Sequence, residues 1–237
     1  MKKFSFLSLT ILTMAFFCCI SCSYLISTAV VSSFGYTTNI SSQPQTVFAI
    51  SLQSDENPKD LNENVTSLQS QNGAGFVFEQ ENKFYLIASV YENVNDAELV
   101  KNNLNSSGIN SEIIEIPLEN NSIKGNFDTN EKEILSASLK ANYNTFKSLY
   151  DIAISLDTGV FDMSKAKLEC NNVYSSLISI KTNLDTFFKN NTEIEFLKEN
   201  LSTSTELLSK LISEQYENIN QTFSSLIKLT YCKILFN

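Results

Sequence analysis

Hydrophobic residues recur with two different periods along this chain, and the change lies near residue 131. Between residues 46 and 117, apolar residues alternate over short segments, as half-buried β-strands do, and two stretches with helical spacing separate these segments. From Glu131 onward the spacing is three or four residues, as in amphipathic helices. The sequence therefore predicts an α+β protein, with a sheet-forming segment at residues 46–117 and an all-α segment at residues 131–237.

The sheet-forming segment contains six predicted elements in the order β-α-β-β-α-β. The strands are expected at residues 47–53, 76–78, 84–91 and 112–116. Asn57 and Pro58 open the first helix, and Asn95 or Asp96 caps the second, which Gly108 closes. Pro117 is expected to end the last strand. Such a unit folds as a ferredoxin-like, four-stranded sheet with both helices on one face, so that the opposite face is left free.

The all-α segment predicts three long helices. The first runs from Glu131 to about Thr158, and the second carries a heptad-like alternation from residue 166 to residue 187. The third begins at Thr192, where Glu195 completes a capping box, and continues toward the C-terminus. Because the connections are short, we expect an antiparallel three-helix bundle or coiled coil.

Residues 1–31 are expected to form a membrane anchor. Residues 4–31 carry no charge and are long enough to cross a bilayer, while Lys2 and Lys3 precede them. The positive-inside rule then places the N-terminus in the cytoplasm and the remainder outside the cell membrane. A cleaved signal peptide, or lipid attachment at Cys22, remains an alternative. The polar residues 32–45 and 118–130 are expected to be linkers.

The composition argues against several classes of function. The chain has no His and no Arg, and its net charge is −9, so it lacks the basic footprint of nucleic-acid-binding proteins. It contains no metal-ligand spacing and no catalytic or nucleotide-binding motif, so we expect no metal, no cofactor and no enzymatic activity. Cys170 and Cys232 can pair across a bundle or remain two buried thiols.

Two stretches carry a resemblance to a known family. Residues 84–97 read FYLIASVYENVNDA and residues 73–78 read GAGFVF. In spacing, both are similar to the SPOR (sporulation-related repeat) domains of the clostridial type, over residues 46–117. The resemblance implies a βαββαβ module that binds septal peptidoglycan, in particular glycan strands stripped of their stem peptides, and that directs envelope proteins to sites of division or sporulation.

Strand alternation also suggests which residues would hold the glycan. Seven residues are expected to point away from the two helices: Ser51, Gln53, Phe76, Phe78, Tyr85, Ile87 and Glu115. Aromatic rings would stack on the apolar faces of sugars, and the polar groups would bond hydroxyls. The alternative is that this face is covered by the C-terminal helices or by a partner.

We therefore expect a single-pass envelope protein that binds denuded peptidoglycan strands through residues 46–117. The competing interpretation is a scaffold, in which the C-terminal helices bind another envelope protein or a second copy of the chain and no glycan is bound.

Overall fold

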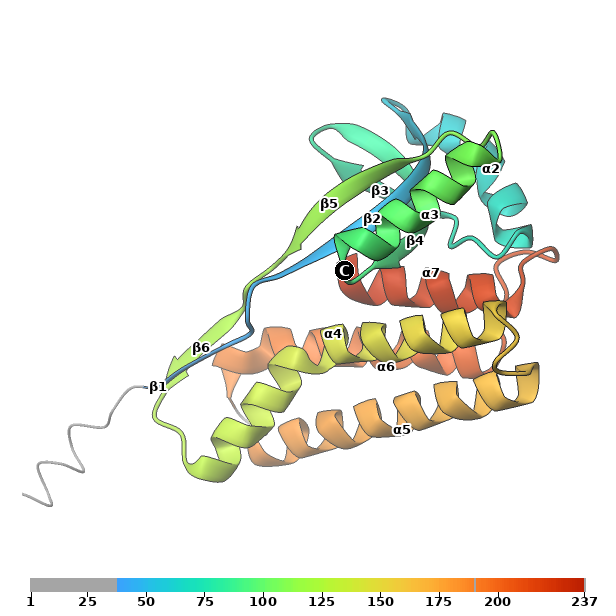
Figure 1. Cartoon of the computed structure of the whole chain (residues 1–237). Helices are drawn as coiled ribbons and strands as arrows, with labels where there is room; N and C mark the ends of the chain where they lie inside the picture. Colours follow the sequence, from blue (N-terminus) through green and yellow to red (C-terminus); the bar gives the residue numbers. More distant parts are fainter. Residues whose placement is uncertain (1–37, 190, 237) are drawn as a thin grey trace, which may run out of the picture. The chain divides into compact units, whose positions relative to one another are not determined.

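The computed structural model describes residues 38–189 and 191–236 (Figure 1). The chain divides into two units, residues 1–39 with 124–127, and residues 40–123 with 128–237. The expected anchor at residues 1–31, and with it the alternatives at Cys22, lies outside the described residues. Among the residues that are described, no helix is long and apolar enough to cross a membrane.

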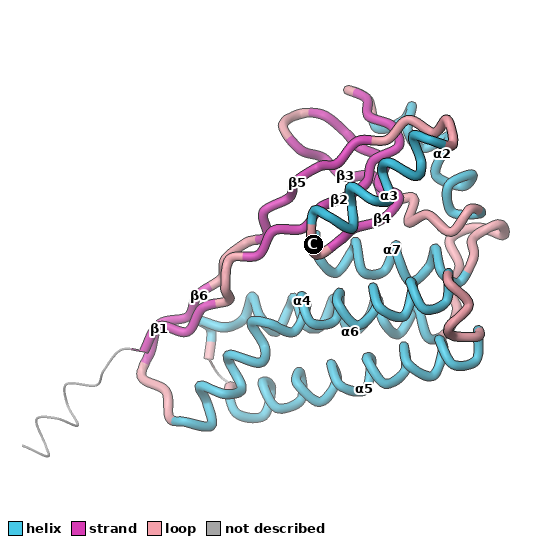
Figure 2. Tube along the Cα trace, in the orientation of Figure 1, coloured by secondary structure: helices cyan, strands magenta, loops and turns pink. Residues whose placement is uncertain are grey.

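The predicted β-α-β-β-α-β order is confirmed. The elements are β2 (Gln45–Asp55), α2 (Pro58–Ser70), β3 (Phe76–Gln80), β4 (Lys83–Tyr91), α3 (Val94–Ser106) and β5 (Glu112–Leu118). The strand order is β3-β4-β2-β5, and each neighbouring pair is antiparallel, as a ferredoxin-like unit requires (Figure 2). The fold is therefore α+β, as the change of period indicates.

Local chemistry explains most of these boundaries. The Asn57 side chain accepts a hydrogen bond from the backbone of Lys59 and caps α2, with Pro58 in its first turn. The β3–β4 hairpin turns through Glu81 and Asn82, whose φ angles are 54° and 62°, the left-handed values that a two-residue hairpin loop needs.

Two predicted boundaries in this segment are wrong. The cap of α3 is Asn93, whose side chain accepts from the backbone of Asp96, so the helix begins before Asn95. Pro117 does not stop β5, because Thr46 pairs with Pro117 and the strand reaches Leu118. β5 is an edge strand, where a residue without a backbone N–H is tolerated.

Each segment that was expected to be a linker contains a strand. β1 (Thr38–Ser41) pairs with β6 (Ser122–Gly125) to form a two-stranded sheet. The Ser42 hydroxyl donates to the backbone oxygen of Asn121 at 3.3 Å and continues this connection. Polar composition alone did not reveal these strands, because β1 and β6 together contain few apolar residues.

The C-terminal segment differs from the predicted three-helix bundle. It forms α4 (Thr129–Asp157), α5 (Met163–Phe187), α6 (Glu195–Ile212) and α7 (Phe223–Phe236). The predicted third helix is interrupted at residues 213–222, where the chain is polar and Glu214 has a left-handed φ of 54°. The predicted capping box of Thr192 and Glu195 is also wrong: Asn191 caps a short 3-10 helix, η1 (Thr192–Ile194), which precedes α6.

α7 is an interior helix. Most of its side chains are buried, on every side of the helix, including Leu226, Ile227 and Tyr231. It packs against α4 and α6 and also against β3 and β4 (Figure 1). Because α2 and α3 pack on the opposite side of the sheet, through clusters around Ile50 and Leu86, the sheet lies between two helical layers.

Candidate functional site

The sheet face that was expected to be free is covered by α7. Val47, Ala49, Ile87 and Val90 belong to this face, and none of them is exposed. Their neighbours in the strand alternation, such as Ile50 and Leu86, face α2 and α3. The alternative stated from the sequence, that the C-terminal helices cover this face, is the one that the structure shows.

The seven predicted site residues do not form one open surface. Ser51 and Ile87 are fully buried, and the Ser51 hydroxyl donates to the backbone oxygen of Gln53 at 2.8 Å. Phe76 and Phe78 pack against Phe236 of α7, with ring centroids 5.8 and 4.8 Å apart. Ser51 and Ile87 are therefore inaccessible to a ligand in the folded protein.

Gln53 and Glu115 are not on the predicted face. The register of β2 against β4 shifts between Ser51 and Gln53, and the Gln53 side chain accepts a hydrogen bond from Asn64 of α2 at 2.6 Å. Glu115 lies opposite Phe48, which packs on the α3 side of the sheet. The β-bulge reverses the alternation, so that Gln53 lies on the α2 side of the sheet. In β5, the register places Ile114 and Ile116, rather than Glu115, on the face that α7 covers.

Tyr85 is the remaining predicted residue, and it is half-buried on β4. The Lys83 ammonium lies 5.1 Å from the centre of its ring, within the range of a cation–π contact. Tyr85 lies opposite Phe78 in the β3–β4 ladder. Tyr85 therefore lies near the edge of the covered face, and not at the centre of an open sheet face as the sequence predicted.

Tyr231 is the residue that fixes the cover, and the sequence patterns did not single it out. It is fully buried on α7, its hydroxyl lies 3.1 Å from the Ser89 hydroxyl, and it accepts from the backbone N–H of Val90 at 3.4 Å. Its ring meets Phe146 of α4 edge to face, with centroids 5.4 Å apart. Burial raises the pKa of Tyr231 well above its ordinary value, so the hydroxyl stays protonated.

An open pocket of about 690 Å³ lies beside this covered face. It is bounded by the end of β5, by α4 and α6, and by the C-terminal end of α7. Its lining includes four aromatic rings and five side-chain amides, namely Phe78, Tyr143, Phe196 and Phe236, and Gln43, Gln45, Asn121, Asn142 and Asn200. Phe78 is the only predicted site residue that reaches it.

Most of the amides in the pocket are available to a ligand. Asn142 is held in place, since its Oδ1 accepts from the Ser204 hydroxyl at 2.9 Å. The structure gives the side chains of Gln43, Gln45, Asn121 and Asn200 no hydrogen-bond partner within residues 38–189 and 191–236. Each amide carries both donors and acceptors, so the pocket can bond hydroxyl and amide groups alike.

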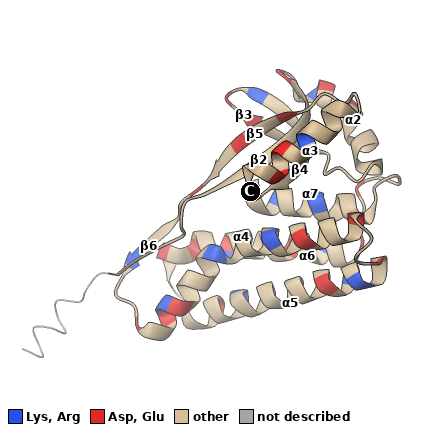
Figure 3. Ribbon diagram, in the orientation of Figure 1, with Lys and Arg blue, Asp and Glu red and all other residues tan. Residues whose placement is uncertain are grey.

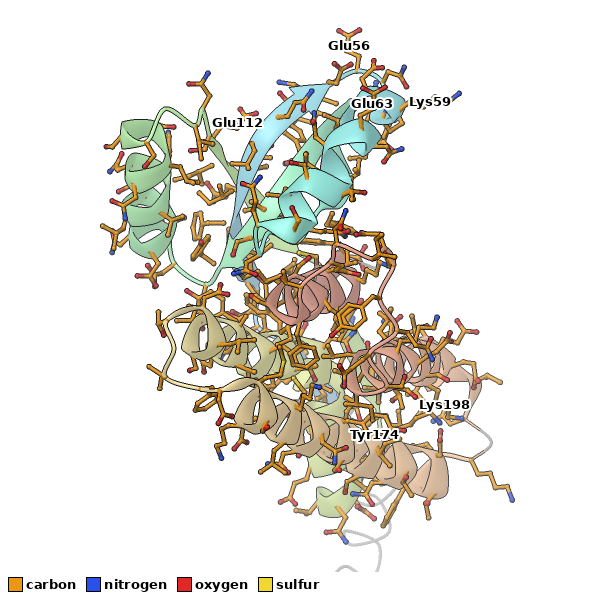
Figure 4. All side chains as sticks on the ribbon, turned by 90° about the vertical axis from the view of Figure 1, so that its right-hand side faces the viewer. Glu56, Lys59, Glu63, Glu112, Tyr174 and Lys198 are labelled. Atoms are coloured by element: carbon orange, nitrogen blue, oxygen red, sulfur yellow. The ribbon has the colours of Figure 1, made fainter. Side chains whose placement is uncertain are left out.

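The pocket is almost uncharged. Glu119 is the only charged residue among the described residues that line it. Elsewhere Lys and acidic residues are interspersed along the helices and strands (Figure 3). Lys59 and Glu63 of α2, and Glu56 just before it, project outward (Figure 4). A cavity with a single carboxylate and no basic group suits a neutral ligand better than an anion.

The Tyr143 hydroxyl is hydrogen-bonded to a residue outside the pocket lining. It donates to Glu92 Oε1 at 3.0 Å, and Lys147 donates to the same oxygen at 2.7 Å. Burial, and then the bond to Glu92, raise the pKa of Tyr143 to about 12, whereas the bond from Lys147 holds the pKa of Glu92 below its ordinary value. Tyr143 therefore offers a neutral, oriented ring.

In the described part of the chain, no group of three or more His, Cys, Asp or Glu side chains could hold a metal ion. Cys170 and Cys232 are both free and buried, as the second of the two readings of these residues predicted.

No family model matches the chain, and neither a curated protein nor a solved structure matches it.

Proposed function

We propose that this protein is a non-catalytic, membrane-anchored protein of the bacterial envelope that binds the glycan strands of peptidoglycan. The membrane anchor and the class of ligand come from the sequence, through the uncharged residues 4–31 and the resemblance to SPOR domains. The observation that supports glycan binding is the open pocket of about 690 Å³, lined by rings and amides, at the edge of the sheet.

The chemistry of this pocket suits a sugar chain. Aromatic rings stack on the apolar faces of pyranose rings, and amides bond hydroxyl and acetamido groups from several directions. A volume of about 690 Å³ is within the usual range of ligand pockets. Glycoside hydrolysis generally needs two carboxyl groups across the scissile bond, and Glu119 is the one carboxylate among the described lining residues, so the proposed role is binding rather than cleavage.

The proposal moves the glycan site away from the centre of the sheet. α7 covers Ser51 and Ile87, and its removal would expose a continuous apolar face. A fragment limited to residues 46–117 would therefore present a surface that the intact protein buries. Binding experiments need the full chain.

The test is co-sedimentation of the full chain, in detergent micelles, with purified sacculi before and after an amidase removes the stem peptides. We expect retention on both, with more protein retained on the stripped material. Equal recovery in the supernatant with and without sacculi would refute glycan binding.

A scaffold role is the second candidate, and one observation favours it. Between α4 and α5 lies an open groove of about 400 Å³, partly lined by the small side chains of Ala141, Ser148 and Ser176. Val173 and Ile180 belong to the heptad-like alternation of residues 166–187, and they line this groove and are only half-buried. A photo-crosslinking residue at Ser176 would form a discrete adduct with a protein partner in intact cells if this role holds, and none if it does not.

A further inference from the structure

Helix α5 carries two apolar rows, each with a spacing of seven residues. The first row is buried where α5 packs on α4 and α6, and consists of Cys170, Leu177 and Leu184. The second row is Val173, Ile180 and Phe187, of which the first two are half-buried and Phe187 is 53% exposed. A seven-residue repeat keeps such side chains on one side of a helix. The described residues therefore leave this second row, the outer seam of α5, only partly covered.

The outer seam borders the open groove of about 400 Å³ between α4 and α5. α5 lies on the side of the helical layer away from the sheet (Figure 1). Ser148 of α4 and Ser176 of α5 both line the groove, and side chains this small let another helix approach closely. Among the described lining residues, Asp151 and Glu169 are the charged ones. The groove therefore has the shape and the low charge that a further amphipathic helix needs.

Charge favours a second copy of this chain as the occupant. The chain has a net charge of −9, so two copies repel each other unless their contact surface is nearly neutral. From residue 170 to residue 180, α5 contains no charged residue. The charged residues on either side are paired within the helix, Lys165 with Glu169 and Lys181 with Asp185. This stretch can meet its own copy without bringing unpaired like charges together.

We propose that the groove binds a second copy of the chain, with the two α5 helices antiparallel and a two-fold axis beside Ser176. Val173 of each copy then lies opposite Ile180 of the other, because this pair is centred between residues 176 and 177. The same surface serves both copies, as a closed two-fold dimer requires. The two α4–α5 hairpins together form a four-helix bundle across the axis.

The antiparallel direction also brings exposed apolar side chains together at both ends of the interface. Phe187 of one copy lies at the level of residue 166 of the other, one turn from Met163, which is 44% exposed. A parallel copy would leave each Met163 at the opposite end from Phe187. The dimer does not depend on glycan binding. It rests on the scaffold candidate for the use of the groove, and it names the partner.

The first test places charge at the axis and measures mass by sedimentation equilibrium of the full chain in detergent. We expect wild type to be dimeric. Ser176→Lys and Ser176→Glu should each raise the dissociation constant of the dimer at least about tenfold, because two like charges meet at the axis. Ser176 is exposed on α5, so both variants should keep the circular dichroism spectrum of wild type.

An equimolar mixture of the two variants should dimerise again, since opposite charges then meet. Ser202→Lys, at an exposed position of α6, is the control and should remain dimeric. A monomeric wild type, a Ser176→Lys variant that dimerises as wild type does, or a mixture that stays monomeric would each overturn the proposal.

The second test reads the direction of the helices. A diazirine analogue of leucine replaces Val173, and normal chains are mixed with isotope-labelled chains, so that mass spectrometry recognises adducts between copies. We expect adducts with the peptide that contains Ile180. Adducts with the peptide segment around residue 173 itself would show a parallel pair and overturn the antiparallel register.

The outcomes also separate the dimer from the proposed functions. A monomeric chain that is retained on sacculi would overturn the dimer and leave glycan binding standing. A dimeric chain that is not retained would refute glycan binding and leave the dimer standing. Cross-linking from position 176 to a different protein, with no adduct between copies, would overturn the second copy as occupant and leave the scaffold role standing.

Discussion

At the scale of single residues, Tyr231 determines which surface of the sheet is available. Its hydroxyl bonds two consecutive residues of β4, Ser89 and Val90, while its ring packs on Phe146 of α4. One side chain thus joins the sheet, α7 and α4 at a position that solvent does not reach. A buried tyrosine whose ring and hydroxyl both have partners helps to specify a unique packing.

Replacing Tyr231 with Phe should lower the free energy of unfolding by about 1–2 kcal/mol, because it leaves the Ser89 hydroxyl and the Val90 N–H without this partner. Urea denaturation followed by circular dichroism would measure the change. Tyr216 is the control: it is 40% exposed and its hydroxyl makes an exposed hydrogen bond to Glu214, so Tyr216→Phe should stay within about 0.5 kcal/mol of wild type. Equal losses in the two variants would contradict the assigned role of Tyr231.

Strand alternation predicts the face of the sheet on which a side chain lies only where the strand is regular. Ile50 and Leu52 pack toward the helices, as their spacing indicates. Gln53 follows a β-bulge, which reverses the alternation and which no short pattern announces.

At the scale of elements, α7 decides the architecture. In sequence it looks like the continuation of a long third helix, since its apolar residues continue the spacing of α6. Two features distinguish it: the polar interruption at residues 213–222, and apolar side chains on all sides, which are typical of a helix buried between layers. The sequence therefore predicts the existence of the C-terminal helices better than their number or their partners.

The burial of α7 can be checked through its cysteine. Burial raises the pKa of Cys170 to about 12 and raises that of Cys232 as well, so at pH 8 both hold less thiolate than an ordinary cysteine does. We expect both to resist iodoacetamide at pH 8 in the native protein and to react fully in urea, as measured by mass spectrometry of peptides. Rapid labelling of Cys232 with Cys170 still protected would mean that α7 leaves the sheet in the native state.

At the scale of the whole molecule, the sheet is an interior layer of the unit formed by residues 40–123 and 128–237. The β-α-β-β-α-β order could be read from the sequence because each of its turns and caps has a local cause, such as Asn57 or Gly108. The covering of the sheet could not, since it depends on contacts between residues more than 100 positions apart, such as Ser89 and Tyr231. The pocket has the same origin, because Phe78, Tyr143 and Phe236 meet only after these layers pack.

The most direct test of this arrangement is hydrogen–deuterium exchange of the full chain with and without the trimer of N-acetylglucosamine, resolved by peptide. We predict added protection in the segments that line the pocket, on α4 around Ser138 and Tyr143 and on α6 around Asn200. β4 should already be protected without the sugar and should not change, because α7 packs against it in both states and none of its residues lines the pocket. Protection confined to β3 and β4, with faster exchange in α7, would contradict this arrangement and return the glycan site to the sheet face.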